Sequence, residues 1–282
     1  MPLLHTVRHH ATKMNVVVSS SFDRLNSADF RFLQEAARLG DVGVLLWSDA
    51  AIRAITGKEP RYPQAERAYV IESVRYVRDV RVSADRVDPD ALPDAFPIRP
   101  DVWAVDAAGA TSAKRAHCAS RGLALHAIAT DEMTGFPEPA AEPASGRKKV
   151  IVTGCYDFFH SGHVRFFEEM AGLGDLFVVV GNDANVRELK GAGHPLLTAA
   201  ERRFTVGAIR HVKQALVSTG MGWMDAAPEI ARLKPDIYAV NEDGDKPEKR
   251  EFCRAHGLEY VVLKRVPKEG LTRRSSTDLR GF

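Results

Sequence analysis

The chain repeats itself, and this duplication limits its possible folds more than any other feature. Residues 19–49 align with residues 153–183 without a gap, and 11 of these 31 pairs are identical. After a shift of one residue, residues 100–123 align with residues 235–258, with 10 of 24 positions identical. Similarity over such lengths indicates that a whole structural unit was duplicated. The 282 residues are therefore expected to form two copies of one fold, each long enough to bury its own core.

The order of apolar runs predicts the fold of each copy. Both halves begin with a run typical of a buried parallel strand, at residues 15–19 and 150–154. In the second half we expect a helix and three further strands at residues 162–173, 176–180, 236–240 and 259–263. Strands that alternate with helices favour a doubly wound parallel sheet, so the expected class is α/β with two tandem Rossmann-like domains.

A proline-rich stretch separates the two copies. Residues 136–146 carry three prolines in their first eight positions, a composition typical of linkers. We predict a first domain at residues 1–138, a linker at 139–148 and a second domain at 149–282.

Composition argues against several classes of partner. The formal net charge is +2, so neither nucleic acid nor an anionic membrane is an expected partner. The longest apolar runs, such as residues 176–181, are far below the roughly 18 residues that span a bilayer. Residues 1–15 lack the apolar core of an export signal, and the three cysteines (Cys118, Cys155 and Cys253) form neither a CxxC pair nor an even disulfide set. A cytoplasmic location is therefore expected.

The motif His160-Ser161-Gly162-His163 lies where a predicted strand gives way to a predicted helix. In open α/β sheets this is where phosphates meet backbone N–H groups and the positive end of a helix. Gly162 has no side chain, so a phosphate can approach the backbone, and the two imidazoles offer donors to the same anion. The motif predicts an electrostatic clamp for a transferring phosphoryl group.

Other interpretations of the motif remain open at this point. The two histidines could belong to a simple helix cap, with His160 near the N-cap. A zinc site is a weaker alternative, because no third ligand is evident and helical zinc pairs usually space their histidines four apart; no metal site is expected. A non-catalytic nucleotide sensor is the alternative from another class of function.

The segment from Gly154 to His163 resembles the signature of the cytidylyltransferase-like nucleotidylyltransferases, the HxGH superfamily. Further family motifs are matched in family order by Lys190-Gly191, Glu201-Arg202, Arg210-His211-Val212 and Arg274-Ser275-Ser276-Thr277. The tandem halves resemble the ethanolamine-phosphate cytidylyltransferase arrangement, here with a degenerate first half. The carboxy-terminal motif is longer than in the family, so the register of Arg265, Arg273 and Arg274 is open.

The resemblance implies roles for individual residues. His160 and His163 would bind the nucleotide's phosphates and stabilise the transition state. Lys190 would neutralise the acceptor phosphate or the α-phosphate, and Arg202 would hold the acceptor or the nucleotide. The remaining nucleotide-binding candidates are Thr153, Gly154, Cys155, Tyr156, Gly162, Asp183, Arg274, Ser275, Ser276 and Thr277.

Two of these assignments carry more detail. Residues 275–277, at the start of a final helix expected at 276–280, would bind the β- and γ-phosphates. Asp183 would contact the ribose or the base; the alternative is a helix cap, since Asp49 stands at the equivalent place in the first half.

The implied reaction is attack of an acceptor's phosphate oxygen on the α-phosphorus of a nucleoside triphosphate, with release of pyrophosphate. CMP transfer from CTP to a phospho-alcohol or phospho-amine is the first expectation. Adenylyl transfer from ATP to a sugar phosphate is close behind, because residues 189–195 resemble loops of the adenylyltransferases of heptose metabolism. A phosphonate acceptor is left open as well. Mg²⁺ is expected to accompany the triphosphate.

The first half has lost the clamp. Asn26, Ala28 and Asp29 stand where the second half has His160, Gly162 and His163, and Thr56 or Lys58 stands near Lys190. Because a carboxylate repels phosphate, this half is not expected to catalyse the same reaction.

The first half keeps a different family feature. Residues 75–80 resemble the segment associated with subunit pairing in the family. We therefore expect a pseudo-dimer within one chain, in which the first half replaces a second subunit, the molecule being a monomer or a further homodimer. The alternative is a first half that binds a different ligand.

Overall fold

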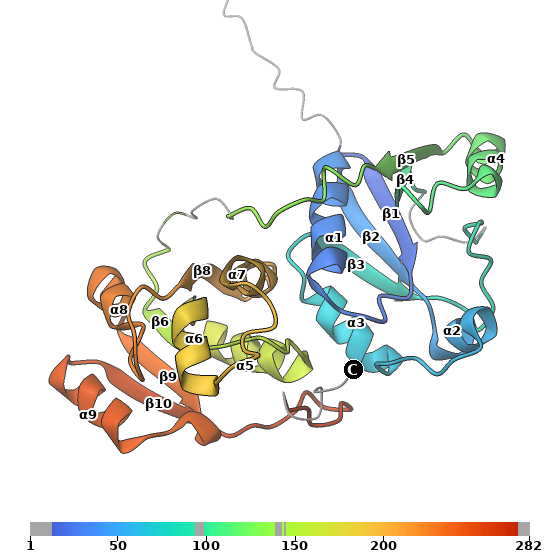
Figure 1. Ribbon diagram of the computed structural model, residues 1–282. Coiled ribbons are helices and arrows are strands. Elements are labelled where there is room, and N and C mark those ends of the chain that lie inside the picture. Colours follow the sequence, from blue (N-terminus) through green and yellow to red (C-terminus); the bar gives the residue numbers. More distant parts are fainter. Residues whose placement is uncertain (1–12, 94–98, 139–142, 144, 276–282) are drawn as a thin grey trace, which may run out of the picture.

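The computed structural model describes residues 13–93, 99–138, 143 and 145–275, and it contains two parallel five-stranded sheets, one from each half of the chain (Figure 1). The strand orders are β3-β2-β1-β4-β5 and β8-β7-β6-β9-β10, so equivalent strands hold equivalent places. The expected α/β class with two tandem Rossmann-like units is confirmed.

The elements of the two halves follow the same order along the chain. The first half contains β1 (Asn15–Ser20), α1 (Ser27–Leu39), β2 (Asp41–Leu46), α2 (Asp49–Thr56), α3 (Gln64–Glu72), β3 (Val77–Val82), β4 (Val102–Asp106), α4 (Ser112–Arg121) and β5 (Ala124–Ile128). The second half contains β6 (Lys149–Gly154), α5 (Ser161–Leu173), β7 (Asp175–Val180), α6 (Asp183–Lys190), α7 (Ala199–Gly207), β8 (Val212–Val217), α8 (Ala227–Leu233), β9 (Ile237–Asn241), the 3-10 turn η1 (Glu242–Gly244), α9 (Pro247–Ala255) and β10 (Glu259–Leu263). Within the described residues, the strand and helix ranges expected from sequence differ from these by one residue at most.

The central strand of each sheet is apolar and is buried on both faces. Val150, Ile151 and Val152 of β6 are all fully buried, as expected for a parallel strand covered by helices on both sides. A glycine precedes the second strand of each sheet for a steric reason. A Cβ on Gly174 would lie 2.2 Å from the carbonyl oxygen of Lys148, and the equivalent contact at Gly40 would be 2.1 Å. Neither position has room for a side chain.

The two halves meet through reciprocal contacts. Val74 and Ile209 form an antiparallel bridge between the halves. Two backbone hydrogen bonds flank it, from Arg75 to the carbonyl of Ala208 (2.8 Å) and from Arg210 to the carbonyl of Ser73 (2.9 Å). Each arginine side chain also donates to backbone carbonyls of the opposite half. Contacts of this reciprocal kind define an isologous interface, so the expected pseudo-dimer is present.

Apolar side chains from both halves form one continuous core across this interface. Phe30 of α1 meets Phe159, next to the histidine motif, edge to face at a ring distance of 6.4 Å. The loop that precedes α5 therefore packs directly on the first half.

Within the described ranges, no helix combines the length and apolarity needed to cross a membrane.

Candidate active site

A cavity of about 330 Å³ opens at the carboxyl ends of β6 and β9, beside the amino terminus of α5. This is the point where the strand order reverses, the usual ligand crevice of open α/β sheets. The residues expected from sequence that line it are Thr153, Gly154, Cys155, Tyr156, Gly162, His163, Lys190 and Ser275. The fold therefore brings together residues from four separate segments of the second half.

The two motif histidines stack on each other at the start of α5. Their ring centroids are 4.0 Å apart. His160 is the N-cap, and its Nδ1 accepts the N–H of Gly162 at 3.1 Å, so the capping geometry considered for this residue is real. His163 lines the cavity, and its buried Nδ1 has no hydrogen-bond partner among the described residues. His163 thus presents an unsatisfied polar atom at the site.

The surroundings of His163 favour its neutral form. Burial lowers the pKa of His163 well below its ordinary value, and the neighbouring His160 and the cations Arg265 and Lys190 lower it further. The same cations favour an anion in this place. A phosphate in the cavity would offset these charges and favour the protonated form of His163, in which both ring nitrogens are donors.

Two glycines leave room for the rings of the site. A Cβ on Gly162 would lie 2.8 Å from Cε1 of His160. A Cβ on Gly154 would lie 2.7 Å from the ring of Tyr156, which itself has a left-handed φ of 58°. Gly162 is therefore required by the His160 ring, a reason additional to the phosphate approach expected from sequence.

Lys190 is the last residue of α6 and lines the cavity at the start of a tethered loop. The tether is Asp157, a buried carboxylate that accepts the N–H groups of Leu196 at 2.9 Å and Leu197 at 3.0 Å. It also lies 3.3 Å from Nδ1 of His194, which faces the same cavity. Sequence reasoning missed Asp157 and His194. The repeat held a signal for Asp157, because the identical residue Asp23 tethers the equivalent loop of the first half.

Arg202 does not lie where a substrate contact requires it, and this expectation needs correction. Its side chain is fully buried. The guanidinium donates to the carbonyls of Leu197 (3.0 Å), Cys155 (2.7 Å) and Gly181 (2.8 Å) and to the carboxylate of Asp183 (2.7 Å). Arg202 thus joins the loops beneath the cavity instead of facing it.

The carboxylate of Asp183 is likewise engaged by another side chain of the protein. It is the first residue of α6, while Asn182 provides the cap, and its carboxylate pairs with Arg202. Asp49 of the first half pairs with Arg67 in the same way, at 2.6 Å. The expected ribose or base contact is not supported by this placement, and Asp183 is not the N-cap either.

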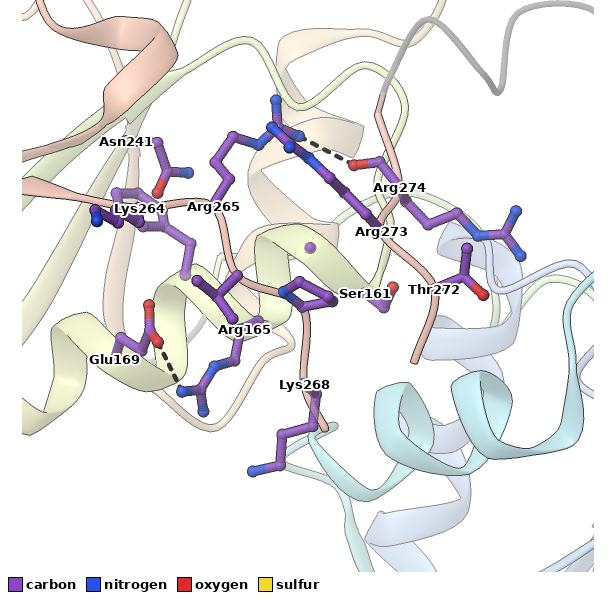
Figure 2. Close-up of a pocket in the computed structure, with 14 residues that line it drawn as sticks. Ser161, Arg165, Glu169, Asn241, Lys264, Arg265, Lys268, Thr272, Arg273 and Arg274 are labelled. Carbon is purple, nitrogen blue, oxygen red and sulfur yellow. Dashed lines mark hydrogen bonds and ion pairs between the residues drawn. The ribbon is translucent and has the colours of Figure 1, made fainter. Parts of the chain in front are cut away.

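The carboxy-terminal segment crosses the amino end of α5 (Figure 2). Arg265 lines the main cavity and donates through Nη2 to the carbonyl oxygen of Arg274 at 3.0 Å. Arg273 and Arg274 line a narrower pocket against Ser161 and Gly162. Of the three arginines whose register was open, Arg265 is the one that reaches the main cavity. Ser276, Thr277 and the expected final helix lie outside the described residues.

In the first half a capping box occupies the place of the clamp. Asn26 accepts the N–H of Asp29 at 3.1 Å, and Asp29 accepts the N–H of Asn26 at 3.2 Å. Burial raises the pKa of Asp29 to about 6. Side chains of the first half thus bind the backbone N–H groups at the amino end of α1. This is compatible with a half that binds no phosphate there.

In the part of the chain that the structure describes, no group of three or more His, Cys, Asp or Glu side chains is arranged to hold a metal ion.

Comparison with known proteins places this site in a family. Residues 151–281 match the family described as cytidylyltransferase-like. The FAD synthase of Ferroglobus placidus is 35% identical over 124 residues, which cover 43% of this chain and 78% of the relative. The chain belongs to the cytidylyltransferase-like family. Its second half carries the family match, and this cytidylyltransferase-like protein is accordingly a nucleotidyltransferase.

Two further relatives are similar to parts of this chain. The FAD synthase of Archaeoglobus profundus is 35% identical over 134 residues, 46% of this chain and 83% of that protein. The bifunctional protein HldE of Azotobacter vinelandii is 33% identical over 139 residues, 48% of this chain but only 27% of its own length. Among solved structures, a lipopolysaccharide core biosynthesis protein from Thermoplasma volcanium is similar over 44% of this chain and all of its own, with 23% identity and a TM-score of 0.37.

Proposed function

We propose that the second half transfers a nucleoside monophosphate from a triphosphate to a phosphorylated or phosphonate small molecule and releases pyrophosphate. The observation that carries this proposal is the unsatisfied Nδ1 of His163, buried at a cavity that Lys190 and Arg265 also line. An imidazole that lines a cavity together with two cationic side chains suits a site where negative charge develops on phosphorus-bound oxygens.

The reaction in this site is a matter of positioning and charge. His163 donates to the α-phosphate, and His160 holds the amino end of α5 and the His163 ring in place through its cap and its stacking. Lys190 neutralises the acceptor phosphate or the α-phosphate as the two approach. Loss of pyrophosphate then follows in-line attack by the acceptor oxygen.

The nucleotide-binding surface includes Thr153, Gly154, Cys155 and Tyr156, which line the cavity. Gly162 and Ser275 also line it. Ser276 and Thr277, which follow Ser275 in the sequence, are proposed to bind the β- and γ-phosphates with it, and Arg274 to order this segment. Arg202 and Asp183 act from beneath, by fixing the loops that present these groups.

We place ATP ahead of CTP as the donor. The relatives named FAD synthase favour this order, because FAD contains an adenylyl group. CTP stays the second candidate on the strength of the Cys155-Tyr156-Asp157 sequence. Mg²⁺ reaches the site with the triphosphate, where substrate phosphates and water supply most of its ligands.

The proposed division of labour follows the halves. Residues 149–282 form the catalytic domain, residues 139–148 the linker, and residues 1–138 a non-catalytic domain. The capping box of Asn26 and Asp29 supports the last assignment, since it fills the place of the phosphate clamp.

The test is a matrix of substrates with pyrophosphate release as the readout. ATP, CTP, GTP and UTP are each combined with phosphorylated alcohols, phosphorylated sugars, FMN and phosphonates in the presence of Mg²⁺. The proposal expects release that depends on both a triphosphate and an acceptor, with ATP preferred. Tight nucleotide binding without release in any combination would favour a nucleotide sensor instead.

A further inference from the structure

A carboxylate of the first half reaches the amino end of the helix that carries the histidine motif. Glu66 lies on α3, and its side chain is only 3% exposed. Ser161, the first residue of α5, donates its hydroxyl to Oε1 of Glu66 at 2.7 Å. The contact joins residues that are far apart in the chain but adjacent across the interface between the halves.

The same carboxylate also holds the carboxy-terminal segment. Arg274 donates from Nε at 3.0 Å and from Nη2 at 2.8 Å to Oε2 of Glu66. Its guanidinium also lies 5.7 Å from the ring centre of Tyr62, another first-half residue. Figure 2 shows the Arg274 side chain directed away from Arg265, toward the helices of the first half. Two donors on one carboxylate make a geometrically specific pair.

The equivalent position in the other half, Glu201, shows that the interface alone does not require the ion pair between Glu66 and Arg274. Glu201 is the equivalent of Glu66, and it accepts the hydroxyl of Ser27, the equivalent of Ser161, at 2.5 Å. Over the described ranges no arginine pairs with Glu201, and its side chain is half-buried. The Ser–Glu bond is thus shared by both sides of the interface, whereas the arginine is added only on the side that has the catalytic histidines.

We propose that Glu66 is a positioning residue which the first half supplies to the active site of the second. This inference rests on the proposed function. By binding Ser161 and Arg274 at once, Glu66 fixes the carboxy-terminal segment across the amino end of α5, next to the cavity-lining Ser275. The leaving pyrophosphate is the group that this segment would hold. The site is therefore completed by both halves, although only one carries the histidines.

Charge and position make opposite predictions for the removal of this carboxylate. A negative charge close to a phosphate site weakens anion binding. If Glu66 acted only through its charge, Glu66→Gln would tighten the binding of pyrophosphate and triphosphate. If it acts by positioning, the substitution weakens binding, because Arg274 loses the partner that orients it.

The experiment compares Glu66→Gln with Glu201→Gln in the full-length chain. Each variant alters one cross-half Ser–Glu bond, so Glu201→Gln is the matched control. Binding of inorganic pyrophosphate is measured by calorimetry, and kcat and KM for the triphosphate by pyrophosphate release. We expect Glu66→Gln to weaken pyrophosphate binding and lower kcat/KM by about tenfold or more, the scale of losing a charge-assisted contact, and Glu201→Gln to change neither.

Two further measurements keep the outcome decisive. Arg274→Lys retains the charge but not the paired donors; it should reproduce the loss, and the double variant with Glu66→Gln should lose little more. If Glu66→Gln does not fold, Arg274→Lys alone decides. Equal behaviour of the Glu66 and Glu201 variants, or tighter pyrophosphate binding by Glu66→Gln, overturns the inference. Absence of turnover in the wild type with every substrate pair counts against the proposed function, while the pyrophosphate affinities still decide the role of Glu66.

Discussion

Arg202 and Arg67 occupy equivalent positions in the two halves and form hydrogen bonds with equivalent sets of partners. Arg67 is fully buried and donates to the carbonyls of Tyr62, Ser21 and Trp47 and to the carboxylate of Asp49. These residues are the repeat equivalents of the four partners of Arg202. A half that lacks the histidines preserves the whole arrangement, so this arginine serves the fold in both halves.

The first prediction follows from this burial. Arg67→Ala and Arg202→Ala should each destabilise the protein by about 3–5 kcal/mol, because each leaves a carboxylate and several carbonyls without their buried partner. Denaturant unfolding measures the effect. A stable Arg202→Ala protein that has lost only its affinity for substrate would restore the direct contact expected from sequence.

The second prediction concerns the glycine of the motif. Gly162→Ala should lower kcat by at least about tenfold, because its Cβ would lie 2.8 Å from the His160 ring and displace it. Gly172→Ala on the same helix is the control, since a Cβ there meets nothing within 4 Å. The control should keep full activity and gain about 0.5–1 kcal/mol in stability. Equal activity of the two variants would contradict the steric argument.

The fold was largely predictable from sequence, because apolar runs and the self-alignment can be recognised without knowing which distant residues are in contact. The apolar run from Val150 to Val152 predicted the buried strand, and residues 75–80 predicted the pairing of the halves. The role of Arg202 was predicted wrongly, because the sequence of the motif does not indicate that this side chain is buried. Glu66 was missed because its partners, Ser161 and Arg274, come from the other half and from the end of the chain, and only the folded interface brings the three together.

The third prediction uses the pKa of His163, which burial and neighbouring cations hold below its ordinary 6.5. Below pH 6.5 the unfolded chain binds a proton at this residue that the folded chain does not, so acidification destabilises the fold through this group. The effect is absent above that pH and grows as pH falls toward the folded pKa.

Comparison with His163→Gln isolates this contribution from that of other groups. The difference in free energy of unfolding between variant and wild type should be constant from about pH 7.5 to 8 and should shift in favour of the variant between about pH 6.5 and 5. Denaturant titrations across this range provide the measurement. A difference that does not vary with pH would mean that His163 titrates normally in the folded chain.

The fourth prediction concerns the loop after Lys190. Asp157→Asn replaces a carboxylate that accepts two backbone N–H groups with an amide that accepts fewer. Since Lys190 begins this loop, kcat/KM for the acceptor should fall by about tenfold. Asp23→Asn, which alters the equivalent tether in the first half, should leave kcat/KM unchanged. The idea would be refuted by equal losses in both variants.

The central claim is that phosphate chemistry takes place at the stacked histidines of the second half. Its most direct test is the rate of pyrophosphate release by His163→Ala and His160→Ala, with Asp29→Asn at the equivalent first-half position as the control. The account predicts a loss of at least about a hundredfold in each histidine variant, because His163→Ala removes the preorganised donor and His160→Ala removes the cap and stacking that position it, and a near-normal rate in the control. Near-normal rates in either histidine variant would contradict it.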